Sequence, residues 1–173
     1  AMRLYEAGKM TFLRRVTFAD VPRFRKSKEF KQIPMARFDY VGFGPQLEKH
    51  PKLREALVKS VDHAGFQKLF ETLSPPGCPG IPKRLMDRVP CQKFDLAGAK
   101  AALKKSGKDI PKLQFHFSMM GGDDIARAAE WFQNQWKKNL GLSLDVRPQE
   151  QGVYVRALKS NPPVMFRKGV GMD

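Results

Sequence analysis

The residues of this sequence that could carry out acid–base or metal chemistry are few and scattered. Its three histidines are His50, His63 and His116. We expect them before a helix, on the wet face of a helix and on a strand, where each imidazole is solvated or hydrogen-bonded. The sequence contains no GxSxG nucleophile elbow and no HExxH zinc motif. These observations favour a protein that is not an enzyme and that carries no cofactor.

Two adjacent pairs of side chains offer alternative chemistry. Asp123 and Asp124 could act as paired carboxylates, but acidic residues at a helix N-terminus are explained more simply as its cap. Met119 and Met120 could supply soft metal ligands. Methionines at the end of a strand more often pack against neighbouring side chains, and we expect that role here. The sequence therefore predicts no metal site.

The two cysteines, Cys78 and Cys91, flank a proline-rich stretch. They lack the CxxC pair or the paired histidines that would accompany a zinc site. A disulfide would suit an oxidising compartment, and two free thiols are the alternative; the sequence leaves both open.

Length and composition restrict the fold. The chain has 173 residues, 42% of them hydrophobic, including 13 phenylalanines, so it can bury a core and is not a disordered chain. No apolar run approaches the roughly 20 residues that span a bilayer. The N-terminal residues do not form a basic region followed by an apolar one, so no signal peptide is expected in the sequence as given.

The net charge of +15 arises from 32 basic and 17 acidic residues. A surface this basic attracts nucleic acid, acidic lipid or acidic protein. The densest basic run, residues 23–28, is short and accompanies no zinc finger, RNA-recognition motif or glycine-rich phosphate loop. A basic nucleic-acid-binding module is the alternative function. Because the charge is scattered, we expect it to keep the protein soluble and expect no nucleic-acid partner.

Two segments have the periodicity of amphipathic helices. Residues 50–66 include Pro51, whose missing N–H suits a first helical position. Residues 125–140 precede Gly141, a typical helix terminator. Each segment collects its small and apolar side chains on one face, so each is expected to pack on a core. Those faces are Leu53, Ala56, Leu57, Ser60, Val61 and Ala64 in the first segment and Ile125, Ala128, Ala129, Phe132, Trp136 and Leu140 in the second.

Predicted strands and helices alternate along the rest of the chain. A strand, a crossover helix and a second strand at this spacing form a βαβ unit with a right-handed connection. The predicted fold class is therefore α/β. Strands are expected over residues 38–43, 113–118, 142–146 and 164–170, with a weaker candidate over 10–16; further helices are expected over 3–8, 18–30, 95–107 and 152–159, and a loop over 74–90.

Several segments together resemble one protein family. "LREAL…SVDHAGF" (residues 53–66) is similar to a segment of the bacterial extracellular solute-binding proteins, which include the oligopeptide-, dipeptide- and nickel-binding proteins of ABC importers. "DLAGAKAALKKSG" (95–107), "NLGLSLDV" (139–146) and "MFRKGVGMD" (165–173) resemble further family segments in the same order. The resemblance extends over nearly the whole chain.

The resemblance implies a periplasmic-binding-protein-like fold of type II, with two α/β lobes around a cleft. Residues 1–45 would form the end of the first lobe and the hinge strand region. Residues 46–173 would form the second lobe, truncated at its C-terminal side. The implied function is the capture of a peptide or similar small solute by hinge closure and its delivery to an ABC permease in the inner membrane. The implied location is the periplasm or cell envelope, with lipid anchoring as one option, and the missing first lobe of the same protein would complete the cleft.

The resemblance also implies ligand-binding residues near the end of the chain. Asp173 stands at the acidic position that meets a peptide's α-amino group in many members, and a carboxylate holds an ammonium by charge-assisted hydrogen bonds. Arg167 stands near a position where some members place a basic residue facing the ligand. Val170 and Gln151 each replace a tryptophan that is usual in the family. These two replacements suggest a divergent ligand, an unusually open site or a role in contacting a partner.

Overall fold

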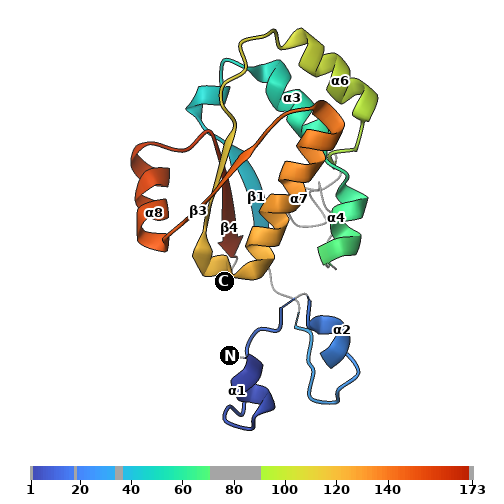
Figure 1. Cartoon of the computed structure of the whole chain (residues 1–173), viewed down its shortest axis with the longest axis vertical. Coiled ribbons are helices and arrows are strands. Elements are labelled where there is room, and N and C mark those ends of the chain that lie inside the picture. The colour runs from blue at the N-terminus through green and yellow to red at the C-terminus, as the bar shows by residue number, and fades with distance from the viewer. Residues whose placement is uncertain (1, 18, 34–36, 71–90, 172–173) are drawn as a thin grey trace. The chain divides into compact units, whose positions relative to one another are not determined.

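The computed structural model describes residues 2–17, 19–33, 37–70 and 91–171. The chain separates into two compact units, Ala1–Pro34 and Met35–Asp173, which we describe individually (Figure 1). The predicted loop over 74–90, and Cys78 with it, lie outside the described residues. Cys91 is disulfide-bonded.

The first unit contains two short helices, α1 (Met2–Glu6) and α2 (Val21–Phe24). The Tyr5 hydroxyl donates to the Glu29 carboxylate at 2.6 Å, and Arg23 pairs with the carboxylates of Glu6 and Asp20. None of the described residues from 2 to 33 is buried. The strand predicted over 10–16 is wrong, because the described part of this unit contains no second strand to accept its backbone hydrogen bonds.

The second unit is built on one four-stranded sheet in the order β1-β4-β2-β3. β4 is antiparallel to β1 and parallel to β2, and β2 is parallel to β3. The strands are β1 (Arg37–Phe43), β2 (Gln114–Ser118), β3 (Asp145–Gln149) and β4 (Met165–Gly171). All four predicted strands outside the first unit are therefore present, although β3 begins three residues later than the alternation indicated.

Helices cover both faces of this sheet. α7 (Asp123–Leu140) connects β2 to β3, and α8 (Gln151–Ser160) connects β3 to β4. The two connections run in opposite directions along the strand order, so right-handed crossovers place the two helices on opposite faces (Figure 1). The other elements are α3 (Pro51–Lys59), α4 (His63–Phe70), α6 (Leu96–Lys105) and two short 3-10 helices, η1 (Pro45–Leu47) and η2 (Met119–Gly121).

The core lies between the sheet, α3 and α7. On β2 the alternation holds as predicted, since Phe115 and Phe117 are buried towards α7. The Trp136 indole N–H of α7 donates to the carbonyl of Leu57 at 2.9 Å. The Asn139 amide, one turn later, donates to the carbonyl of Ser60 at 2.7 Å. α7 therefore satisfies two carbonyls at the C-terminal end of α3, which a helix otherwise leaves unpaired.

The helix predicted over 50–66 is interrupted. α3 ends at Lys59, where the Ser60 hydroxyl donates back to the Leu57 carbonyl at 3.0 Å. α4 then starts at His63, and the Asp62 carboxylate accepts from the backbone N–H of Gly65 at 3.0 Å. Ser60 thus ends α3 and Asp62 caps the start of α4, although the apolar pattern of the sequence continues across both residues. His63 is half-buried rather than wet, and this burial lowers its pKa.

Candidate functional site

The strand order identifies one edge of the sheet as the candidate site. The connection from β2 leads outward to β3, whereas the connection from β3 returns past β2 to β4. The reversal falls between β2 and β4. In open α/β sheets, ligands bind outside the carboxyl ends of the strands at such a reversal. We call the ends of β2, β3 and β4, at Ser118, Gln149 and Gly171, the carboxyl edge; β4 points to it in Figure 1.

The turn after β2 presents two methionines at the carboxyl edge. The Ser118 hydroxyl accepts from the N–H of Met120 at 3.1 Å, and the N–H of Gly122 donates to the Met119 carbonyl at 3.0 Å. Gly122 has a φ of +70°, a conformation that favours glycine. The Met119 and Met120 side chains are 56% and 76% exposed. The expectation that they pack at the strand end is wrong, because the tight turn directs both away from the core.

The start of α8 forms a second part of the carboxyl edge. The Glu150 carboxylate accepts from the backbone N–H groups of Gly152 at 2.8 Å and Val153 at 3.0 Å. These hydrogen bonds lower the pKa of Glu150, so the capping group remains charged. Gln151 is half-buried, and Val153 is 45% exposed.

β4 carries two of the three ligand residues that the sequence predicted. The Arg167 guanidinium pairs with the Asp39 carboxylate of β1, and the arginine side chain is 17% exposed against 43% for its partner. Val170 is 42% exposed. Side chains three positions apart on a strand point to opposite faces, so Arg167 and Val170 do not converge on one point. Asp173 lies outside the described residues.

The backbone of Arg167 is fixed from the other face of the sheet. The Tyr154 hydroxyl of α8 donates to the Arg167 carbonyl. Tyr154 is buried, and this burial raises its pKa to about 12. Arg167 is thus held by its side chain on one side and by its backbone on the other.

Sequence reasoning missed Asp39 and Tyr154 as partners of Arg167. Asp39 is 128 residues away from Arg167 in sequence. Their proximity depends on the β1–β4 register, in which Asp39 faces Gly169 and Val41 faces Arg167. No local pattern signals that pairing. Tyr154 lay within a predicted helix, but nothing in the sequence indicated which strand the helix would cover.

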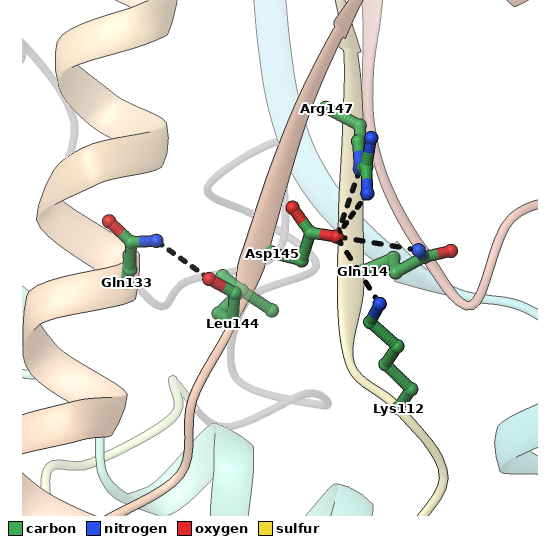
Figure 2. A network of polar contacts seen from close by, with 6 residues as sticks. All are labelled: Lys112, Gln114, Gln133, Leu144, Asp145 and Arg147. Carbon is green, nitrogen blue, oxygen red and sulfur yellow. Dashed lines mark hydrogen bonds and ion pairs between the residues drawn. The ribbon is translucent and has the colours of Figure 1, made fainter.

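A second polar cluster lies at the amino ends of β2 and β3, away from the carboxyl edge (Figure 2). The Asp145 carboxylate accepts from the Arg147 guanidinium at 2.6 and 2.9 Å and from the Gln114 amide at 3.5 Å. The hydrogen bonds from Arg147 lower the pKa of Asp145. A largely apolar hollow lined by residues 110–113 and 142–145 adjoins the cluster. Because these polar groups pair with one another, Arg147 with Asp145 within β3 and Gln114 with Asp145 across to β2, we interpret them as structural.

The described part of the chain contains no group of three or more His, Cys, Asp and Glu side chains arranged to hold a metal ion. None of the helices in the described ranges is both long enough and apolar enough to cross a bilayer.

Comparison with known proteins relates the whole chain to one family. Residues 1–173 match the family described as bacterial extracellular solute-binding proteins, family 5 Middle. No protein of curated function matches the sequence.

Solved structures with the same fold include three binding proteins from different bacteria. A periplasmic oligopeptide-binding protein, OppAIV of Borrelia burgdorferi, is 18% identical, with a TM-score of 0.77 over 98% of this chain and 36% of its own. The periplasmic binding protein DppA of Helicobacter pylori, in complex with the peptide STSA, is 16% identical, with a TM-score of 0.74 over 99% of this chain and 35% of its own. NikA of Staphylococcus aureus, in complex with Ni(L-His)2, is 17% identical, with a TM-score of 0.75 over 98% of this chain and 38% of its own. The chain therefore spans little more than a third of the length of these proteins, and the likeness confirms the predicted α/β fold.

Proposed function

The chain belongs to the bacterial extracellular solute-binding proteins, family 5, and from this we propose that it serves in the substrate-binding component of an ABC importer. Members of this family are transport components and not enzymes. The ligand that we propose is a peptide or a similar small solute. The observation that carries this proposal is the family match over all 173 residues. The exposed side chains at the carboxyl edge support the proposal, because ligands of open α/β sheets bind at that place.

We propose that residues 46–173 belong to the second lobe of a two-lobed protein and residues 1–45 to the end of the first lobe and the hinge. The carboxyl edge would then line one wall of the cleft, and the rest of the first lobe would supply the other wall. A ligand that contacts both walls stabilises the closed form, which the membrane permease would recognise. The family is extracellular, so the proposed location is the periplasm or cell envelope, where a lipid anchor could hold the protein.

For the ligand contacts we propose Asp173 as the partner of an amine, with Arg167 and Val170 nearby on β4. Arg167 would reach a ligand carboxylate only by sharing its guanidinium with Asp39, to which it is already paired. In the sequence, Asp173 follows the last residue of β4, Gly171, by two positions. A carboxylate at that place would provide a negative charge for an α-amino group.

The test is calorimetry on the full-length protein with short peptides and their N-acetylated forms. Asp173→Asn keeps the shape of the side chain and removes its charge. We expect affinity for a free-amine peptide to fall by on the order of 2 kcal/mol or more, because the bound ammonium loses its charged partner. N-acetylation of the peptide should lower the affinity of the wild type by about the same amount. It should lower the affinity of the variant little further.

Asp109→Asn is the matched control, since Asp109 is exposed in the turn that follows α6. This variant should bind like the wild type. Equal affinity in all four combinations of wild type or Asp173→Asn with free or acetylated peptide would remove Asp173 from the site. Absence of binding to any peptide or small solute would reject the proposed function.

A further inference from the structure

We infer that Gln149 contacts the bound solute, and that its carboxamide oxygen accepts a hydrogen bond from an amide N–H of that solute. This inference rests on the proposed function and specifies a residue that recognises the backbone of a peptide ligand. Gln149 is the last residue of β3, and its neighbour Ser118 is the last residue of β2. Both lie at the carboxyl edge.

The register of the sheet brings Gln149 and Ser118 together. They are direct partners in the parallel ladder between β2 and β3. Four residues earlier in each strand, the Gln114 amide donates to the Asp145 carboxylate at 3.5 Å, so those two side chains lie on the same face of the sheet. Because side chains alternate along a strand, Ser118 and Gln149 share that face. Their side chains are therefore neighbours at the point where both strands end.

The connections that follow β2 and β3 leave these strand ends towards opposite faces of the sheet. The chain continues after β2 into α7 and after β3 into α8. α7 and α8 cover opposite faces (Figure 1). In open α/β sheets, ligands bind outside the carboxyl ends of neighbouring parallel strands whose connections diverge in this way. Gln149 lies at that position.

The Gln149 carboxamide oxygen is available to a ligand. Among the described residues, Gln149 Oε1 is a buried atom without a hydrogen-bond partner, and so is Nδ1 of His116, two residues before Ser118 on the same face. Native proteins pair nearly all such buried atoms with protein, water or ligand. The Ser118 hydroxyl oxygen, by contrast, already accepts from the Met120 N–H at 3.1 Å. Of the two neighbouring side chains, Gln149 thus has the unused acceptor.

The charges that flank these strand ends favour a hydrogen-bond donor on the ligand. Acidic residues begin both flanking helices, Asp123 and Asp124 in the first turn of α7 and Glu150 as the N-cap of α8. Carboxylates oppose the approach of an anionic group. A carboxamide oxygen requires an N–H or O–H from its partner. An amide N–H is an uncharged donor, and a peptide supplies one at each residue that follows a peptide bond, except proline.

The experiment replaces amide N–H groups of a peptide ligand by ester oxygens. Calorimetry on the full-length protein first identifies the alanine peptide of two to five residues that binds most tightly. Each of its amide N–H groups is then exchanged in turn. The wild type should bind the parent peptide about tenfold more tightly than one of these ester analogues, because that analogue cannot donate to Gln149 Oε1 and leaves it unpaired.

Gln149→Met keeps the length of the side chain and removes its carboxamide. This variant should bind the parent peptide several-fold more weakly than the wild type does, and should no longer distinguish it from that ester analogue. Gln149→Glu keeps an acceptor oxygen and should retain the distinction. Gln92→Met is the matched control, because Gln92 is exposed in the segment before α6. It should leave every affinity unchanged, and thermal melting should show that the variants are folded.

Three results would overturn the inference while leaving the proposed function intact. The first is equal wild-type affinity for the parent peptide and all its ester analogues. The second is a Gln149→Met variant that binds like the wild type, or that weakens the parent and its analogues by the same factor. The third is binding restricted to solutes without an amide N–H. Failure to bind any peptide or other small solute would reject the proposed function itself.

Discussion

The environment of Tyr154 opposes ionisation of its hydroxyl. Its hydroxyl is buried under α8 and donates to the Arg167 carbonyl, and its pKa is raised to about 12. A tyrosinate could not make this hydrogen bond, because it has no proton to donate. Tyr154 thus joins α8 to the central strand β4 only in its neutral form.

A pH dependence follows for the stability of the second unit. The unfolded chain loses the Tyr154 proton near pH 10, whereas the folded chain keeps it to about pH 12. The contribution of the Tyr154 hydroxyl to the free energy of unfolding is therefore complete below about pH 10 and is lost as the pH rises through 12. Within that window the loss is about 1.4 kcal/mol per pH unit. Urea unfolding at a series of alkaline pH values measures this loss.

Tyr154→Phe provides the comparison, because it keeps the ring and removes the titrating group. The variant should be less stable than the wild type at neutral pH, and its stability should decline less steeply above pH 10. The ultraviolet absorbance of tyrosinate should show one late-ionising tyrosine fewer in the variant. Parallel decline of both proteins above pH 10 would contradict this role.

At the scale of elements, α7 is the helix on which the second unit depends. It packs on the sheet, caps the end of α3 through Trp136 and Asn139, and contributes to an aromatic cluster. In that cluster Phe132 stacks on Trp136 with ring centroids 5.4 Å apart. Removing volume from either side of the α3–α7 contact should therefore destabilise both helices.

We predict that Leu57→Ala and Phe132→Ala each lower the free energy of unfolding by roughly 2–5 kcal/mol, as buried large-to-small changes do. Leu57 is 0% exposed, whereas Phe132 is only partly buried and should fall at the lower end of that range. Thermal and urea melts measure the change. Leu69→Ala, on an exposed face of α4, is the control and should cost little. If both variants were as stable as the wild type, the faces of α3 and α7 that contain Leu57 and Phe132 would not contribute to the core.

Elements whose signals are local were predictable from the sequence. The alternation of apolar and polar residues correctly predicted β2. Gly141, with a φ of +72°, ends α7 where expected. The break between α3 and α4 was missed because a continuous apolar pattern hid the local hydrogen bonds of Ser60 and Asp62. The weak strand over 10–16 failed because alternation predicts a strand only where a partner strand exists.

The candidate site was less predictable, because it depends on pairing over long distances in sequence. Arg167 and Val170 were identified from their place in a family-like segment. The partner of Arg167 came from a strand near the other end of the chain. The exposure of Met119 and Met120 depends on a turn stabilised by Ser118 and Gly122, and the sequence pattern did not distinguish it from packing at a strand end.

At the scale of the whole molecule, the basic excess is distributed rather than focused. Exposed lysines and arginines occur on α6, α7 and α8 as well as in the first unit. Several cations have acidic partners: Arg23 pairs with Glu6, Lys52 and Lys59 with Glu55, and Arg147 with Asp145. Pairing of this kind reduces the charge available to a polyanion.

We predict that the chain binds nucleic acid only weakly. Titration of labelled duplex and single-stranded DNA at physiological salt should give a Kd no tighter than ~10⁻⁶ M, with a steep dependence on salt and no sequence preference. Such binding reflects phosphate contacts by scattered cations. Tight, sequence-selective binding would instead support the alternative of a nucleic-acid-binding module.

The position of β4 has a consequence for synthesis on the ribosome. β4 lies between β1 and β2, yet it is translated after the other three strands of this sheet, and Arg167 follows its partner Asp39 by 128 residues. At 5–20 residues per second, β1 waits roughly 6–26 s for β4, its neighbour among the described strands. Until β4 emerges, β1 cannot join the sheet, and the nascent chain exposes an unpaired strand. Closure of the sheet therefore waits for β4, the fourth of its strands in sequence order.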